Sequence, residues 1–170
     1  MERNPLPVPE IEERLRERFG DAVLGVEDVF GHASVSLTSE AWVEAATFLR
    51  DEPSLALDFL DFTTGVDRGE EGIEVISHLF STKHAHSVRI KVLCAGEEPA
   101  CPTLSGVFPG SDWHERETAE MFGVRFEGHP NATTLLLSDR FEGMPLRKDF
   151  ALMSREVKPW PGDVEGEEEE

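Results

Sequence analysis

The sequence predicts an α+β fold: a mostly antiparallel sheet with two N-terminal helices packed on it, a short third helix and an extended C-terminal arm. Helical and alternating apolar patterns follow one another along the chain, and short polar turns join most of the alternating segments. The regular strand–helix rhythm of a parallel nucleotide-binding sheet is missing. We therefore expect a domain over residues 1–137, a partner-binding arm over 138–161 and an acidic, disordered tail over 162–170.

The N-terminal part of the chain predicts a helix followed by two strands. Over Glu10–Phe19 apolar residues recur at every fourth position among Glu and Arg, and Gly20 follows as a stop signal. Ala22–Phe30 is rich in Val, and after a turn Ser34–Thr38 alternates between apolar and small polar residues. Such alternation is typical of a half-buried strand.

The middle of the chain predicts a second helix and three more strands. Ser39 is a suitable cap for a helix over Glu40–Arg50, which carries an apolar stripe. Leu55–Phe62 alternates and then enters an expected turn at residues 63–65. Two further alternating segments form a predicted hairpin, Ile73–Ser81 and Ser87–Cys94.

The C-terminal part predicts a third helix and then little regular structure. A proline-rich loop over Ala95–Pro109 precedes it. Asp112 can cap a helix over Trp113–Phe122, which Gly123 stops. Thr133–Leu137 is a candidate strand, and the chain beyond it is irregular.

The charge limits the partners of this chain. Thirty-five acidic residues against 16 basic ones give a net charge of −19, which excludes autonomous binding to nucleic acid and repels anionic lipids. No apolar run approaches the roughly 18 residues of a membrane span, and residues 1–9 lack an apolar signal core. We therefore expect no export, and membrane association only through another protein.

The reactive residue types predict no metal, cofactor or catalytic residue in this chain. We expect Cys94 and Cys101 to be free thiols, and two thiols are too few for an iron–sulfur cluster. No Gly-rich phosphate loop and no Cys–His or Ser–His frame occurs. His78, His84 and His86 could hold a metal across the hairpin, but the simpler interpretation places the last two beside a solvated turn.

Residues 113–130 combine charged and apolar side chains. On a helix Glu115, Arg116 and Glu117 point in three directions and cannot converge on one substrate. Arg116 and Glu120 are spaced to pair on one face. A solvated acidic helix is the plain alternative, and the apolar residues argue for anchoring in a core or a partner. These residues are Trp113, Met121, Phe122, Val124 and Phe126.

The arm has its own charge balance. From Arg140 to Lys158 five basic and three acidic residues give +2 inside a chain of −19. So few apolar residues cannot build a core. The arm must lie on its own acidic domain or on another protein.

Three ordered motifs resemble the 30 kDa subunit family of respiratory complex I, whose bacterial members are the C subunits of NADH–quinone oxidoreductase. They are Trp113-His-Glu-Arg-Glu-x-x-Glu-Met-Phe-Gly-Val, Phe126-Glu-Gly-His-Pro and Pro145-Leu-Arg-Lys-Asp-Phe. Leu57–Asp67 resembles the family strand that leads into a Thr-Gly-Val-Asp turn. The chain departs from the family pattern at Ala119-Glu120, Thr133 and Met144.

The resemblance implies a non-catalytic scaffold subunit in the hydrophilic arm of a proton-translocating NADH–quinone oxidoreductase, peripheral at the cytoplasmic face of the cell membrane. The implied partners are other subunits of that arm, chiefly the quinone-site (D) subunit and the iron–sulfur subunits, and FMN and the iron–sulfur clusters would reside in partners. The implied assembly contacts are Trp113, Glu115, Arg116, Glu117, Phe122, Gly123, Gly128, His129, Pro130, Pro145, Leu146, Arg147, Lys148, Asp149 and Phe150.

Two alternatives stay open. The equivalent subunit of a membrane-bound hydrogenase or a coenzyme-F420 dehydrogenase would share the same core motifs. A free acidic adaptor that binds basic partners through its Glu-rich tail would explain the charge, but not the three ordered motifs.

Overall fold

The computed structural model describes residues 6–138 and 140–151. In this part of the chain the elements are α1 (Val8–Phe19), η1 (Gly20–Ala22), β1 (Val23–Val29), β2 (His32–Leu37), η2 (Ser39–Ala41), α2 (Trp42–Asp51), β3 (Phe59–Asp67), η3 (Gly69–Glu71), β4 (Ile73–Phe80), β5 (Ser87–Cys94), β6 (Ala100–Pro102), α3 (Ser111–Phe122) and β7 (Arg125–Glu127).

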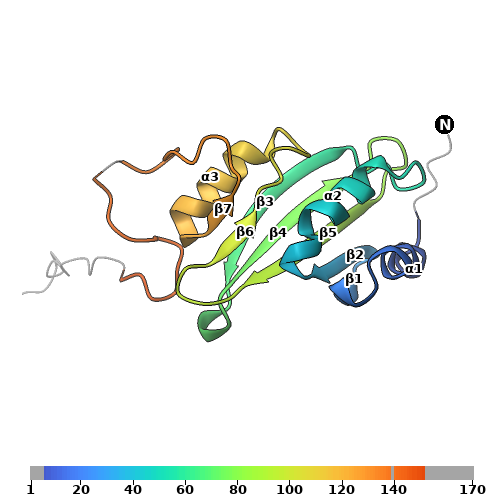
Figure 1. Cartoon of the computed structure of the whole chain (residues 1–170), viewed down its shortest axis with the longest axis horizontal. Coiled ribbons are helices and arrows are strands. Elements are labelled where there is room, and N and C mark those ends of the chain that lie inside the picture. Colours follow the sequence, from blue (N-terminus) through green and yellow to red (C-terminus); the bar gives the residue numbers. More distant parts are fainter. Residues whose placement is uncertain (1–5, 139, 152–170) are drawn as a thin grey trace, which may run out of the picture.

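Five of the described strands form one sheet in the order β1-β2-β5-β4-β3 (Figure 1). Three neighbouring pairs are antiparallel, whereas β2 and β5 run parallel with Val35 opposite Ile90. The predicted α+β class with a mostly antiparallel sheet is therefore confirmed. The parallel pair is central because the chain leaves β2, forms α2, β3 and β4, and returns beside β2 as β5.

The two N-terminal helices pack on the sheet, as predicted. Figure 1 shows α2 lying across the sheet and α1 at the end formed by β1 and β2, while α3 lies at the opposite end beside β3. Ile11 and Leu15 of α1, Trp42 of α2, Val75 of β4 and Ile90 of β5 are at most 1% exposed and belong to one core. Burial of such side chains contributes about 1.5–3 kcal/mol each.

Strand β3 differs from its prediction, because it starts at Phe59 instead of Leu55. Leu55 and Leu57 are buried as their alternation indicates. Ala56 between them has a φ of +45°, in the left-handed region. The buried pair therefore belongs to a turn, and the strand begins after it.

The same strand continues through residues 63–65, where a turn was predicted. The buried hydroxyl of Thr63 shares a hydrogen bond of 2.7 Å with Ser77 on β4, so its polarity is satisfied inside the sheet. Gly65 lies under the ring of Phe122, where a Cβ would sit 2.7 Å from a ring carbon. Turn-forming residue types here serve cross-strand bonding and close packing.

Helix starts also differ from prediction. Ser39 makes no side-chain cap, because a short 3₁₀ turn precedes α2, which begins at Trp42. The third helix begins at Ser111 after Gly110, so Asp112 lies inside it. Both starts lie two residues from the predicted ones, a difference that is usual at helix termini.

Two short strands were missed, and one predicted strand does not form. β6 lies within the expected loop 95–109 and pairs in parallel with β7, with Cys101 opposite Phe126. Thr133–Leu137 is not a strand, since its backbone is bonded to side chains of α3, as described below. Three-residue strands are too short to show an alternation.

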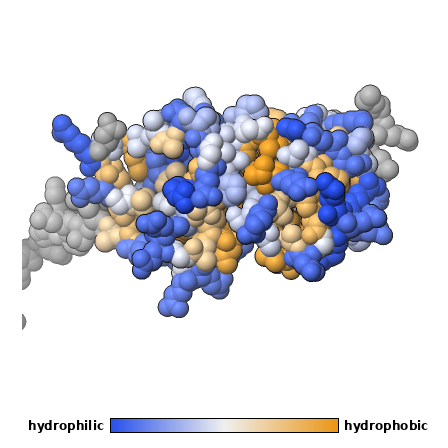
Figure 2. Space-filling model, in the orientation of Figure 1, coloured by the Kyte–Doolittle hydropathy of each residue, from blue (hydrophilic) through white to orange (hydrophobic). Residues whose placement is uncertain are grey.

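None of the helices in the described ranges is both long and apolar enough to cross a membrane. Figure 2 shows hydrophilic side chains over most of the face seen in Figure 1, with an apolar strip between α2 and α3.

Candidate functional site

Helix α3 presents its consecutive charged residues to three environments, as the helical geometry predicts. Glu115 is buried, Arg116 is half-buried and Glu117 is exposed. Gly123 ends the helix with a φ of +74°, and its N–H donates to the carbonyl oxygen of Ala119 over 2.8 Å. A glycine is favoured there because other residues adopt this conformation only with strain.

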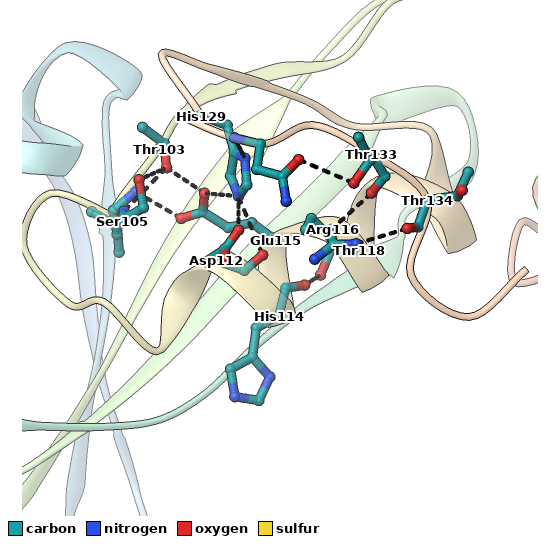
Figure 3. A network of polar contacts seen from close by, with 12 residues as sticks. Thr103, Ser105, Asp112, His114, Glu115, Arg116, Thr118, His129, Thr133 and Thr134 are labelled. Atoms are coloured by element: carbon teal, nitrogen blue, oxygen red, sulfur yellow. Dashed lines mark hydrogen bonds and ion pairs between the residues drawn. The ribbon is translucent and has the colours of Figure 1, made fainter.

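The buried carboxylate of Glu115 holds the loop that follows β6. It accepts the backbone N–H of Leu104 over 2.7 Å and a short hydrogen bond from the hydroxyl of Thr103 (Figure 3). Burial raises the pKa of Glu115 above its usual range, although these hydrogen bonds oppose the shift. The carboxylate of Glu115 thus positions the backbone of the loop after β6 in the interior of the protein.

His129 joins the same network from the segment after β7. Its Nε2 lies 3.2 Å from the carbonyl oxygen and 3.1 Å from a carboxylate oxygen of Asp112, and 3.8 Å from the carboxylate of Glu115 (Figure 3). Its Nδ1 accepts the N–H of Asn131 over 3.1 Å. With Nδ1 as acceptor, Nε2 carries a proton and donates toward Asp112. The imidazole therefore links the start of α3 to the chain beyond β7.

Arg116 and Glu120 both hold the segment that was predicted to be a strand. Arg116 donates to the carbonyl oxygens of Thr133 and Thr134 over 2.8 and 2.7 Å (Figure 3). Glu120 accepts the N–H groups of residues 135–137, at 2.9 Å for Leu136 and 3.1 Å for Leu137.

The predicted pairing of Arg116 with Glu120 therefore takes another form, because both side chains bind one length of backbone. Partial burial opposes ionisation of Glu120. The three N–H groups and the guanidinium of Arg116 outweigh it and place the pKa of Glu120 below its usual range.

The described part of the C-terminal segment contacts the end of α3 and of β3. The N–H of Leu146 donates to Met121 O over 3.1 Å, and Nε of Arg147 donates to Phe122 O over 2.6 Å. The N–H of Lys148 donates to the carboxylate of Asp67 over 2.7 Å. The first two contacts use carbonyl groups that the helix end leaves without intrahelical partners, and the third uses a carboxylate at the end of β3.

An open cavity of about 410 Å³ lies between α3, β7 and the segment 132–144. Its walls include Ala119, Phe126, Leu137, Phe141 and Met144. Arg116 and Glu120 at its edge are engaged with backbone, and Arg125 pairs with the carboxylate of Glu127 over 2.9 Å, so the remaining lining is mainly apolar. Such a cavity suits an apolar side chain better than a charged ligand.

The other sequence-predicted contact residues divide between packed and exposed. Pro145 and Phe150 are half-buried, and Phe150 stacks on Phe141 with ring centres 6.0 Å apart. The exposed ones are Trp113, Glu117, Gly128, Pro130, Leu146, Lys148 and Asp149. Trp113 and Leu146 are 66% and 56% exposed, and large apolar side chains at such exposure are candidates for partner contacts.

Sequence reasoning missed the residues at the far ends of these bonds. Asp67 was considered only as the end of a family-like strand, and Asp112 only as a cap. Thr103 lies in a loop that carries no pattern. The one available signal was the charged cluster on α3, which required partners wherever it was buried.

The three-histidine metal site is not formed. His78 lies 3.1 Å from Asp61 and stacks on Phe62, and His84 stacks on His86 with ring centres 5.8 Å apart. Within residues 6–138 and 140–151 no group of three or more His, Cys, Asp or Glu residues is arranged to hold a metal ion.

This chain is similar to several known proteins. A family model described as the 30 kDa subunit of respiratory-chain NADH dehydrogenase matches residues 35–156. The C subunit of NADH-quinone oxidoreductase from Roseiflexus sp. (strain RS-1) is 42% identical over 147 residues, which is 85% of this chain and 84% of the relative. The C 2 subunit of NADH-quinone oxidoreductase from Rhizobium meliloti (strain 1021) is 41% identical over 150 residues, which is 87% of this chain and 82% of the relative.

Two solved structures resemble this one. The trypsin-resistant fragment (1–134) of Nqo5 superposes with a TM-score of 0.59 at 25% identity, covering 71% of this chain and 98% of that chain. A chain of the membrane-bound sulfane sulfur reductase, an archaeal respiratory membrane complex, superposes with a TM-score of 0.72 at 21% identity, covering 85% of this chain and 86% of that chain. The second likeness establishes a shared fold.

Proposed function

The chain belongs to the 30 kDa subunit family of respiratory-chain NADH dehydrogenase, and from this membership we propose that it is the non-catalytic scaffold (C) subunit of a proton-translocating NADH–quinone oxidoreductase. The observation that carries the scaffold role is the use of the charges on α3. Glu115, Arg116 and Glu120 all bind backbone of their own chain. Groups engaged in this way position segments and leave no free acid–base pair for a substrate.

The proposed partners are the other subunits of the hydrophilic arm, chiefly the quinone-site (D) subunit and the iron–sulfur subunits. Trp113 and Leu146 are exposed apolar anchors of the kind that dominates protein interfaces, and the cavity of about 410 Å³ between α3 and the segment 132–144 offers a pocket for a partner side chain. Through these partners the chain would lie peripherally at the cytoplasmic face of the membrane.

We propose that residues 138–161 are the arm that engages neighbours. The described part is anchored at Met121, Phe122 and Asp67 and keeps Leu146 exposed; residues 152–161 lie outside the described residues. The related Nqo5 fragment was trypsin-resistant and matches only 71% of this chain. This supports an arm that is open to protease until a partner covers it. The predicted acidic tail, 162–170, also lies outside the described residues.

No cofactor is proposed in this chain; FMN and the iron–sulfur clusters would belong to partners. The free protein should therefore have no absorption above the protein band in the visible range. Flavin or iron–sulfur absorbance that stays with the chain through gel filtration would contradict the proposal.

The equivalent subunit of a related membrane complex is the second candidate, because the sulfane sulfur reductase chain shares the fold over 85% of this chain. Affinity purification from detergent-solubilised membranes with mass spectrometry separates the two. A flavin- and NADH-binding subunit together with a quinone-site subunit supports the first. A large hydrogenase subunit with nickel-ligating cysteines supports the second, and basic soluble partners alone would favour a free adaptor.

A further inference from the structure

One face of the five-stranded sheet is packed against the helices. Val75 of β4 and Ile90 of β5 point to that face. They form one core with a residue from each α-helix, namely Leu15, Trp42 and Phe122. Along β4 and most of β5 the buried residues alternate with half-buried or exposed ones. Since successive side chains of a strand point to opposite faces, these alternate residues lie on a second face that none of the described helices covers.

The strand register shows which residues share this second face, which we call the open sheet face. They occupy three rows across three adjacent strands: Phe62, Thr64 and Val66 of β3, His78, Ile76 and Glu74 of β4, and Arg89, Lys91 and Leu93 of β5. From the spacing of strands and of alternate residues, the nine positions span about 10 Å by 14 Å. Such an area suits a segment of another protein better than a small ion.

Most charges on the open sheet face are paired within the chain. The pairs are Lys91 with Glu27 at 3.0 Å, Glu74 with Arg68, and His78 with Asp61 at 3.1 Å. The ring of His78 also stacks on Phe62, with ring centres 5.4 Å apart. These charged groups therefore need no partner from outside.

Arg89 is the exception. Its side chain is half-buried, and its Nε is buried without a hydrogen-bond partner. With residues 6–138 and 140–151 Arg89 forms neither a hydrogen bond nor an ion pair. The other half-buried arginines of these ranges all donate to an oxygen of the chain; they are Arg14, Arg50, Arg116 and Arg147.

The unbonded guanidinium of Arg89 is unfavourable in the free chain. A buried donor that has lost water without gaining an acceptor costs free energy, and the cost is larger for a charged group. The acceptor has to come from outside the described residues. A carboxylate is the best match, because it accepts two parallel hydrogen bonds from a guanidinium group.

We propose that the open sheet face docks a segment of a second protein that is mostly apolar and carries one carboxylate, which pairs with Arg89. Apolar side chains of that segment cover Ile76 and Leu93, and Leu93 is 46% exposed in the free chain. The net charge of −19 repels polyanions, so one carboxylate among apolar residues fits this face better than an acidic stretch. The paired charges form a polar rim around an arginine anchor, as in many protein interfaces.

This interface lies away from the surface used in the proposed function. Helix α3 packs through Phe122 on Gly65, which points to the opposite face from its neighbour Thr64. Arg89 and Leu93 belong to none of the family motifs. The inference rests on the proposed function only in that the chain works together with another protein, whichever complex that protein belongs to.

Photo-cross-linking of the full chain in its native membranes tests the interface. With p-benzoylphenylalanine in place of Leu93, irradiation should join the chain to one partner protein. Mass spectrometry should find an Asp or Glu among mostly apolar residues in the cross-linked peptide. The same probe in place of Phe30, which is 98% exposed after β1, is the control and should not yield that peptide.

Arg89→Met assigns the role of the guanidinium group. Methionine keeps an apolar stem and removes no bond within the described residues, so the melting temperature of the free chain should stay within about 2 °C of the wild type. The yield of the cross-link at position 93 should fall about threefold or more, because a charged anchor is lost. Arg18→Met, on an exposed residue of α1, is the matched control and should leave the yield unchanged.

Four results would overturn the proposal: no cross-link from position 93, a cross-link to residues 152–170 or to a second copy of the chain, a partner peptide without a carboxylate, or an unchanged yield in Arg89→Met. Co-purification of the complex subunits separates this inference from the proposed function. If those subunits co-purify and the cross-link is missing, only the interface fails. If the cross-link forms to a protein of another complex, the interface stands and the proposed function fails.

Discussion

Glu115 shows how a single charged residue can serve as an internal support. Its side chain is 1% exposed, yet it holds Leu104 and Thr103 and lies near His129. A buried carboxylate is tolerated only when its oxygen atoms are bonded, and here both are. Burial still raises the pKa of Glu115.

Glu115→Gln should make folding less dependent on pH. Because the pKa of Glu115 is raised in the folded state, its carboxyl favours folding fully below the ordinary carboxyl pKa of about 4.3. This contribution is lost as pH rises through the folded-state pKa. The amide can still accept the Leu104 N–H, so the variant should gain stability relative to the wild type as pH rises from about 4. Urea unfolding across the pH range measures the difference.

Two further variants complete the test: Glu115→Ala removes the hydrogen-bond acceptor, and Glu117→Gln is the exposed control. The alanine variant leaves the Leu104 N–H without its acceptor and opens a cavity, so its free energy of unfolding should fall by about 2–4 kcal/mol. Glu117 is exposed, and its glutamine variant should stay within about 0.5 kcal/mol at every pH. Parallel pH curves for the wild type and Glu115→Gln would show that the carboxyl is not responsible.

Arg116→Ala should lower the amount of assembled complex and leave turnover per assembled complex unchanged. The substitution removes two hydrogen bonds to the carbonyls of Thr133 and Thr134, at a cost of about 1–3 kcal/mol to the order of that segment. Native gels and quinone reductase assays of the same membranes measure both quantities. Arg18→Ala, an equal charge change on an exposed residue of α1, is the matched control. Normal assembly with a large loss of turnover would indicate a catalytic role.

At the scale of elements, the end of α3 is the junction between the domain and the arm. Gly123 has a φ of +74° and little space around its Cα. A Cβ at this position would lie 3.0 Å from a guanidinium nitrogen of Arg147 and 3.2 Å from a side-chain carbon of Met144. Arg147 reaches Phe122 O beside this position. The glycine therefore serves both the helix end and the approach of the arm.

Gly123→Ala should loosen the arm without unfolding the sheet. The left-handed conformation costs an L-residue about 1–2 kcal/mol, and the added methyl group pushes Arg147 from its carbonyl partner. Trypsin should then cut after Arg147 or Lys148 several-fold faster than in the wild type. Gly106→Ala is the control, because a Cβ there meets nothing within 4 Å. Equal cleavage rates in the two variants would argue against the junction.

At the scale of the whole molecule, domain and arm should be separable. Every helix and strand of the described residues lies before residue 138, and the arm adds backbone contacts to Met121, Phe122 and Asp67. The domain thus contains the entire core cluster, while the arm depends on a surface for its order.

Removal of the residues after Asp139 should leave a folded domain that fails to join the complex, whereas removal of Glu165–Glu170 should not affect joining. Circular dichroism and co-purification measure folding and assembly. Limited proteolysis should cut the free chain within 138–161 quickly, and assembly should protect it. Equal resistance of free and assembled chains would place the arm within the domain core.

The sequence by itself determined the features that depend on neighbouring residues. The alternation over Ser87–Cys94 matches β5 at both ends, and the stop signal at Gly123 ends α3. The α+β class followed from such local patterns, and three ordered motifs were sufficient to indicate the family. Side-chain periodicity and the backbone conformations that each residue type prefers act over a few residues, so the sequence alone predicts them.

Only the tertiary structure decided where the charges of α3 are bonded and which polar segments form strands. Glu115 and Arg116 bind backbone 11 to 18 residues away, and Thr63 is satisfied by Ser77 on a neighbouring strand. The same bonding keeps 133–137 out of any sheet. A buried polar group must find a partner, but its identity depends on which distant segments the fold brings within hydrogen-bond distance.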